Sequence, residues 1–173
     1  MNIVLLGYRG TGKSTIARIV SKRLHRRLFS IDTIIAKTAN SSIHEIVKKH
    51  GWPGFRQMET EHLKSLAKRY NNAVIDCGGG AVLNPENIHL LKQQGRVVCL
   101  TADMEEILKR IKKDPNRPPL KEGISFEEEQ KLVMLEREPL YRAAADMIYD
   151  TTQTSADETA SKIIRFFRDN RWI

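Results

Sequence analysis

The sequence has few cysteines, few aromatic side chains and no long hydrophobic run, and each shortage narrows the choice of fold. Only two cysteines, Cys77 and Cys99, occur among 173 residues. That number is too small for a disulfide-stabilised mini-domain or a cysteine-rich zinc site. Both lie in apolar stretches, so we expect buried free thiols in a reducing compartment.

Membrane attachment is not expected either. The apolar run at residues 3–6 is much shorter than the roughly 20 residues that span a bilayer. No basic leader precedes it, so it does not have the pattern of a signal peptide. We therefore expect a cytoplasmic chain with no membrane partner.

Positive charge exceeds negative charge, with 29 Lys and Arg against 21 Asp and Glu, for a net charge of +8. Such an excess suits anionic ligands. The densest basic cluster, residues 18–27, contains no Phe, Tyr or Trp on which a base could stack. It falls near the end of a predicted helix, where the helix dipole favours cations. We expect this structural role and no nucleic-acid partner.

Short apolar runs alternate with helix-compatible stretches along the chain. Strands are predicted over residues 2–6, 28–31, 73–76, 96–100 and 146–150. This alternation is typical of an α/β fold with a parallel sheet covered by helices on both faces. The length suits one domain, residues 1–173.

Several helix starts carry capping signals. Ser42 is followed by Glu45 in the pattern of a capping box, and Asn84 precedes a proline. Asp103 and Ser125 are further predicted caps. Two segments resist a regular assignment, residues 49–55 with Gly and Pro, and residues 112–123, which are rich in proline and charge and predict a mobile loop.

The stretch GYRGTGKST, residues 7–15, matches the phosphate-loop pattern between a strand and a predicted helix over residues 13–25. Its glycines let backbone N–H groups turn toward phosphate oxygens, and the helix adds its positive end. Lys13 would reach the β- and γ-phosphates, and the Ser14 hydroxyl would bind Mg²⁺. The chain is therefore predicted to bind a nucleoside triphosphate.

The class of phosphate-loop protein follows from what else is present. The Asn-Lys-x-Asp stretch that reads guanine is absent, and a motor ATPase usually needs a larger domain. A small-molecule kinase needs a carboxylate near the acceptor hydroxyl, cations that hold the acceptor, and a mobile arginine over the phosphoryl group.

Five motifs together resemble the shikimate kinases. They are the phosphate loop, FRQME at 55–59, GGGAV at 78–82, RPPL at 117–120 and REPLY at 137–141. The resemblance covers nearly the whole chain. It implies a three-layer P-loop kinase fold, with a five-stranded parallel sheet in the order 2-3-1-4-5, a substrate-binding region at about 32–60 and a mobile lid at about 112–124. It also implies transfer of the γ-phosphoryl of ATP to the 3-hydroxyl of shikimate.

The resemblance assigns a role to each motif residue. Asp32 would bind and orient the acceptor hydroxyl, as a carboxylate can, although it could instead cap a helix starting at Thr33. Arg56, oriented by Glu59, and Arg137 would hold the acceptor carboxylate. Catalysis would rest on Asp32, Lys13 and Arg117. ATP would be bound by Gly7, Arg9, Gly10, Thr11, Gly12, Lys13, Ser14, Thr15, Arg110 and Arg117, and the acceptor by Asp32, Arg56, Gly78, Gly79, Gly80 and Arg137.

One position departs from the family pattern. Shikimate kinases usually have Asp-x-Asp at the end of the second strand, whereas this chain has Ser30 in place of the first, metal-associated aspartate. Asp76 ends the third strand, where many phosphate-loop proteins place a carboxylate near Mg²⁺. We hypothesise that Asp76 supplies the missing negative charge. Ser14 would bind Mg²⁺ directly, and Asp76 would lie near the metal without binding it directly.

Two other functions stay open at this point. One is a kinase for another small acid or polyol such as gluconate, which would leave Arg56 and Arg137 facing away from a common cavity. The other is an ATP-binding regulator weakened by the loss at Ser30, although Asp32, Arg117 and Lys13 complete a transfer set that a sensor does not need. Trp52 could line the acceptor site or shield the core. A monomer is expected.

Overall fold

The computed structural model describes residues 1–111, 119–121 and 123–173. Arg117 and most of the predicted lid at 112–124 therefore lie outside the described residues.

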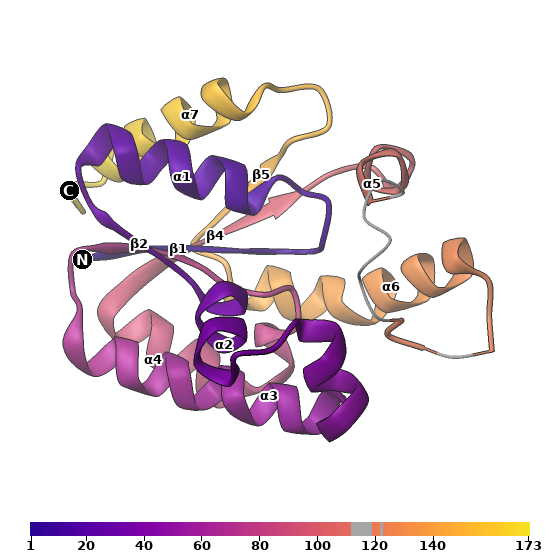
Figure 1. The fold of residues 1–173 in the computed structure, drawn as a ribbon. Coiled ribbons are helices and arrows are strands. Elements are labelled where there is room, and N and C mark those ends of the chain that lie inside the picture. The colour runs from indigo at the N-terminus through magenta and orange to yellow at the C-terminus, as the bar shows by residue number, and fades with distance from the viewer. Residues whose placement is uncertain (112–118, 122) are drawn as a thin grey trace.

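Five parallel strands form the central sheet (Figure 1). Their order is β2-β3-β1-β4-β5, which confirms the predicted topology. The strands are β1 (Asn2–Gly7), β2 (Arg27–Ser30), β3 (Ala73–Asp76), β4 (Gly95–Thr101) and β5 (Met147–Asp150). The predicted strands match these bounds to within one residue at each end.

Helices cover both faces of the sheet (Figure 1). On one face lie α1 (Lys13–Leu24) and α7 (Ala156–Asp169), and on the other lie α3 (Ile43–Arg69), α4 (Pro85–Gln94) and α6 (Phe126–Ala144). Side chains alternate along β1, with Ile3 and Leu5 in the core under α1 and α7, and Val4 and Leu6 in the opposite core. Because β1 is central and buried on both faces, it is apolar from Ile3 to Leu6.

The remaining elements are short and lie near the carboxyl ends of the strands. They are α2 (Ile31–Ala39), the 3₁₀ turn η1 (Ala81–Leu83) and α5 (Met104–Ile111). The carboxyl ends of parallel strands are where open α/β sheets bind ligands. Within the described part of the chain, no helix is both long and apolar enough to cross a bilayer.

Capping signals located most of the helix starts. Capping boxes are present at Ser42 and Ser125, and the Asn84 side chain accepts a hydrogen bond from the Glu86 N–H ahead of the helix that begins with Pro85. The backbone carbonyl of Asp103 accepts from Ile107, as expected of a residue that opens a helix.

Two local predictions were wrong. Residues 49–55 lie within α3, on both sides of a kink. Gly51, with φ 66° and ψ 174°, is itself non-helical and forms the kink, and Pro53 stands in the first turn after it, where its missing N–H costs nothing. Helix α2 begins at Ile31 with Ser30 as its N-cap, so Asp32 lies in the first turn and is not the cap.

Basic residues of the cluster at 18–27 form contacts between separate parts of the fold. Arg23 forms an ion pair with Asp157 at 2.5 Å and so joins α1 to α7. Arg26 donates a 2.8 Å hydrogen bond to the carbonyl of Met1. Lys22 and Arg23 lie in the last turn of α1, where the helix dipole favours them.

Candidate active site

The phosphate loop joins β1 to α1. Gly7, Gly10 and Gly12 all have positive φ, between 82° and 138°, which glycine adopts without the strain of a Cβ. Lys13 is 9% exposed, and its ammonium donates a 2.7 Å hydrogen bond to the carbonyl of Tyr8. The Lys13 side chain is thus folded back against the backbone of the loop.

A cavity of about 310 Å³ opens beside this loop. It is lined by the loop residues Arg9, Gly10, Gly12, Lys13, Ser14 and Thr15, together with Arg110 and Asp76. Gly7 and Thr11, also predicted to bind ATP, shape the loop from behind: an added Cβ at Gly7 would lie 2.2 Å from the carbonyl oxygen of Leu100, and the Thr11 hydroxyl donates to Tyr8 at 2.8 Å.

A larger cavity, about 840 Å³, adjoins the first. All six residues predicted to bind the acceptor line it, namely Asp32, Arg56, Gly78, Gly79, Gly80 and Arg137. Arg9, Ser14, Ser30, Asp32, Gly78 and Gly79 line both cavities. A donor in the smaller cavity and an acceptor in the larger one would therefore meet at this shared wall.

Two carboxylates converge on Gly78. A Cβ at that position would lie 2.7 Å from Asp32 Oδ1 and 2.9 Å from Glu59 Oε1, so any other residue would have to displace these carboxylates. Both oxygens are buried and have no hydrogen-bond partner in the described part of the chain. Because buried acceptors are normally satisfied, these two are suited to a ligand's hydroxyl groups.

Arg56 is held between a carboxylate and two aromatic rings. Its Nη1 lies 2.9 Å from Glu59 Oε2, the pairing that the one-turn spacing predicted, and its guanidinium lies 5.2 Å from the ring centroids of Trp52 and Phe55. A Cβ at Gly80 would overlap the guanidinium, at 2.0 Å from Cζ. Burial raises the pKa of Glu59, and the Arg56 charge opposes this shift.

Trp52 lines the larger cavity and also packs against the core, so both roles that the sequence left open are present. Its indole N–H donates a 2.9 Å hydrogen bond to the carbonyl of Pro119, which lies within the predicted lid.

Arg137 reaches the cavity from α6 and is 8% exposed. It lies beside Tyr141, whose pKa is raised by burial and whose hydroxyl donates to the carbonyl of Gly79. Sequence reasoning assigned no role to Tyr141, although the residue belongs to the REPLY motif. It fixes the glycine turn against the helix that carries Arg137.

Arg110 lines the smaller cavity and is fixed by backbone carbonyls. Its guanidinium donates to Gly10 at 3.1 Å and to Thr151 at 3.0 Å, and it pairs with Glu106 at 2.9 Å. It therefore ties the phosphate loop to the segment after β5.

The two cysteines are buried free thiols, as predicted, and burial raises the pKa of both.

Ser30 and Asp76 are register partners on the adjacent strands β2 and β3. Both line the smaller cavity together with Ser14, and Asp76 is 5% exposed. In phosphate-loop proteins, Mg²⁺ takes most of its ligands from phosphate and water, with one hydroxyl and one nearby carboxylate from the protein. This chain supplies that pair, so its residues fit the metal.

Comparison with known proteins agrees with this geometry. A family model described as "Shikimate kinase" matches residues 9–168. The shikimate kinase of Geobacter metallireducens is 41% identical, covering 94% of this chain and 89% of that protein. That of Syntrophus aciditrophicus is 39% identical, covering 99% of this chain and 93% of that protein. A solved structure, shikimate kinase from Acinetobacter baumannii in complex with shikimate, has a TM-score of 0.91 at 36% identity, covering 98% of this chain and 93% of that chain.

Proposed function

This chain belongs to the shikimate kinase family, and we propose that its two adjoining cavities hold the two substrates, ATP in the smaller and shikimate in the larger. The enzyme transfers the γ-phosphoryl of ATP to the 3-hydroxyl of shikimate, with Mg²⁺ as the metal. The family's chemistry leaves open which side chains of this sequence carry out each step.

Asp32 orients the acceptor hydroxyl and accepts its proton, a role supported by the unpartnered, buried Oδ1 that faces the cavity. Arg56 and Arg137 pair with the shikimate carboxylate, and the N–H groups of the glycine turn at 78–80 are within reach of its hydroxyls. Lys13 binds the β- and γ-phosphates. Bound Mg²⁺ would neutralise phosphate charge, held by Ser14 directly and by Asp76 through water.

We propose that Arg117 closes over the phosphoryl group, which stays a prediction because the residue lies outside the described residues. We propose in addition a single domain, which works as a monomer in the cytoplasm with no nucleic-acid partner. Size-exclusion chromatography with light scattering checks the oligomeric state.

The observation that carries this assignment is the convergence of Arg56, Arg137 and Asp32 on one cavity beside the phosphate loop. Two guanidinium groups in one pocket favour an acid over a neutral polyol. A coupled assay of ADP release with Mg²⁺-ATP and shikimate, quinate or gluconate tests the assignment. We expect turnover with shikimate and little with the other two. All three acceptors carry a carboxylate that the arginine pair could bind, so comparable turnover with quinate or gluconate would mean that the rest of the cavity does not select shikimate, and the assignment would fail.

Asp76 is proposed to take the metal-associated role that Ser30 cannot fill. Removing a carboxylate that holds a metal through its outer shell typically costs about 10- to 100-fold in metal affinity or activity. We therefore expect Asp76→Asn to lose most of the Mg²⁺-dependent increase in ATP affinity, measured by calorimetry with Mg²⁺ and with EDTA. Binding of Mn²⁺ in the ATP complex, followed by electron paramagnetic resonance, should weaken in parallel.

The register of Ser30 and Asp76 provides a matched rescue. The exchange variant Ser30→Asp/Asp76→Ser moves the carboxylate to the neighbouring strand and should recover much of the lost metal binding. An Asp76→Asn protein with unchanged metal dependence of ATP affinity would refute the role of Asp76. Failure of the exchange alone would show that the two positions are not equivalent.

A further inference from the structure

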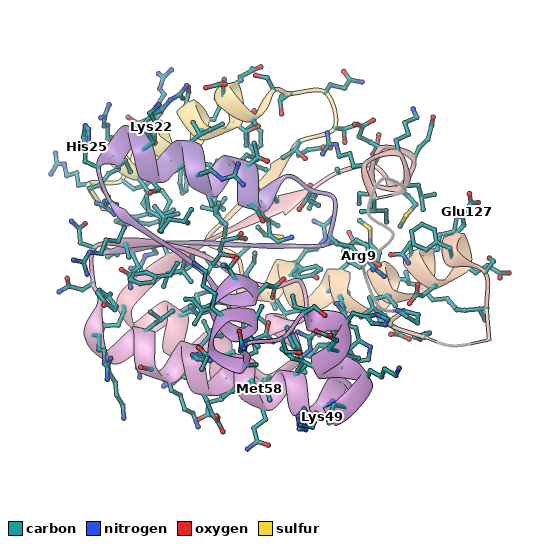
Figure 2. The ribbon with its side chains drawn as sticks, viewed as in Figure 1. Arg9, Lys22, His25, Lys49, Met58 and Glu127 are labelled. Carbon is teal, nitrogen blue, oxygen red and sulfur yellow. The ribbon has the colours of Figure 1, made fainter. Side chains whose placement is uncertain are left out.

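Arg9 is a largely buried cation at the boundary between the two cavities, and it lines both. It belongs to the phosphate loop, where the pattern leaves its position free to vary. Its side chain is 10% exposed. Figure 2 shows Arg9 within the molecule near α6, whereas Lys22 and His25 lie at the periphery.

Two of the three guanidinium nitrogens lack a hydrogen-bond partner among the described residues, although the guanidinium also interacts with the side chain of Tyr8. Nε and Nη2 are buried and make no hydrogen bond to any described residue. The nearest carboxylate, Glu129 Oε2, is 3.6 Å from Nη2, an ion pair beyond hydrogen-bond length. Burying guanidinium donors without acceptors is unfavourable, so the arrangement is expected where an anionic ligand supplies the missing acceptors.

Glu129 fixes the position of this cation. It is 3% exposed, and its oxygens accept hydrogen bonds from the backbone N–H groups of Leu120 and Lys121 and, at 2.7 Å, from Gln130 Nε2. Gln130 Oε1 in turn accepts a 2.7 Å bond from the Tyr8 hydroxyl. These contacts leave Glu129 little freedom to move toward Arg9 and close the gap.

We propose that Arg9 is a further catalytic residue, whose guanidinium binds the phosphoryl group as it passes from ATP to the acceptor and then holds the phosphate of the product, and that Glu129 is its positioning residue. This inference rests on the proposed placement of the two substrates. It assigns to a side chain a role that the phosphate-loop pattern leaves to backbone N–H groups.

In this step the bond from the γ-phosphorus to the β,γ-bridging oxygen breaks, and a bond to the 3-oxygen of shikimate forms. The hydroxyl proton passes to Asp32, and ADP leaves with the bonding electron pair. Arg9 stays protonated and transfers no proton. It stabilises charge on the equatorial oxygens of the phosphoryl group, which bear most of the transition-state charge.

The decisive measurement compares two ligands that differ by one phosphate. Calorimetry with shikimate and with shikimate 3-phosphate, each without nucleotide, reports the affinity that the phosphate adds. We expect Arg9→Met to bind the phosphorylated ligand about 10- to 150-fold more weakly, the range of a hydrogen bond to a charged group. Its affinity for shikimate should change little. Turnover should fall about 10²- to 10³-fold with little change in KM for ATP.

Three variants make the test specific. Arg18→Met removes the same charge from the exposed side of α1 and should resemble wild type. Arg9→Lys keeps the charge without the planar fork and should be intermediate. Glu129→Gln should lower the affinity for shikimate 3-phosphate without lowering that for shikimate. Combined with Arg9→Met, it should add little further loss, because the two residues act together.

The outcomes separate the claims. If wild type neither binds nor phosphorylates shikimate, the proposed substrate placement fails. If wild type does both and Arg9→Met keeps its preference for the phosphorylated ligand, the inference on Arg9 alone is overturned. If Arg9→Met weakens ATP binding as much as it slows turnover, Arg9 serves donor binding and the catalytic role is refuted. If Glu129→Gln weakens both ligands equally, its positioning role is refuted.

Discussion

Asp32→Asn is expected to lower kcat by about 10²- to 10⁴-fold, the usual contribution of a positioned general base. The amide keeps the size of the side chain but cannot take a proton from the acceptor hydroxyl. Asp32 Oδ1 is buried at the wall shared by the two cavities, with no hydrogen-bond partner in the described part of the chain. Single-turnover formation of shikimate 3-phosphate measures the chemical step directly.

Nucleotide affinity provides the internal control for this variant. Calorimetric affinity for Mg²⁺-ATP should stay close to wild type, because Lys13 and the loop backbone supply that binding. Asp169→Asn, which changes an exposed carboxylate on α7, should leave turnover unchanged. Near wild-type turnover in Asp32→Asn would mean that positioning without proton transfer is enough for the attack.

Residues that line the larger cavity or lie beside it have buried polar atoms without hydrogen-bond partners among the described residues, so ligand binding there should affect the stability of the fold. Asp32 Oδ1, Glu59 Oε1 and two nitrogens of Arg9 are buried without hydrogen bonds in the described residues. Each such group destabilises the ligand-free protein. In the proposed placement, shikimate and the transferred phosphoryl group would provide the matching hydroxyls, carboxylate and phosphate oxygens. Substrate binding should therefore raise the melting temperature, as any ligand specific to the folded state does.

Much of this architecture could be predicted because local signals and the global fold agree. The strands at residues 2–6 and 73–76 were found from apolar runs, since buried parallel strands need no alternation. The phosphate loop has a fixed spacing set by its backbone geometry. The motif residues Arg56 and Arg137, which are 81 positions apart in the sequence, could be placed in one cavity only through the family resemblance.

Other features depend on contacts that the sequence does not reveal. The helix at residues 49–55 was missed because Gly51 and Pro53 usually break helices, and only the kink shows that each stands where it is tolerated. Glu129 belongs to none of the recognised motifs, and its ion pair with Arg9 joins residues that are 120 positions apart in the sequence. Both the kinked helix and the ion pair depend on tertiary contacts, which local sequence patterns do not show.

The buried pair of Arg56 and Glu59 gives the second large effect. Arg56→Met is expected to destabilise the protein by about 3–5 kcal/mol, because Glu59 would be left buried without its counter-charge. For a chain of this size, that corresponds to a melting temperature lower by roughly 6–20 °C. Thermal unfolding followed by circular dichroism measures the change. The same variant should lose affinity for shikimate, because one of the two guanidinium groups is gone.

The pH dependence of this variant identifies the cause. Burial raises the pKa of Glu59 above its ordinary value of 4.5, so the folded protein binds this proton more tightly than the unfolded chain does. The unfolding free energy therefore falls as pH rises through the window from 4.5 to the raised pKa. Removing Arg56 takes away the stronger of the two arginine charges that oppose the rise in the pKa of Glu59, and so widens the window. Acidification from neutral pH should accordingly recover stability in Arg56→Met more than in wild type.

Arg56→Met/Glu59→Gln separates folding from substrate binding. The neutral amide removes the buried charge, so most of the lost melting temperature should return, as when both partners of a buried pair are replaced together. Affinity for shikimate should not return, because the guanidinium that pairs with its carboxylate is still absent. If the double variant regained shikimate affinity along with stability, Arg56 would act by supporting the fold. If it stayed as unstable as Arg56→Met, the unpaired charge of Glu59 would not be the cause.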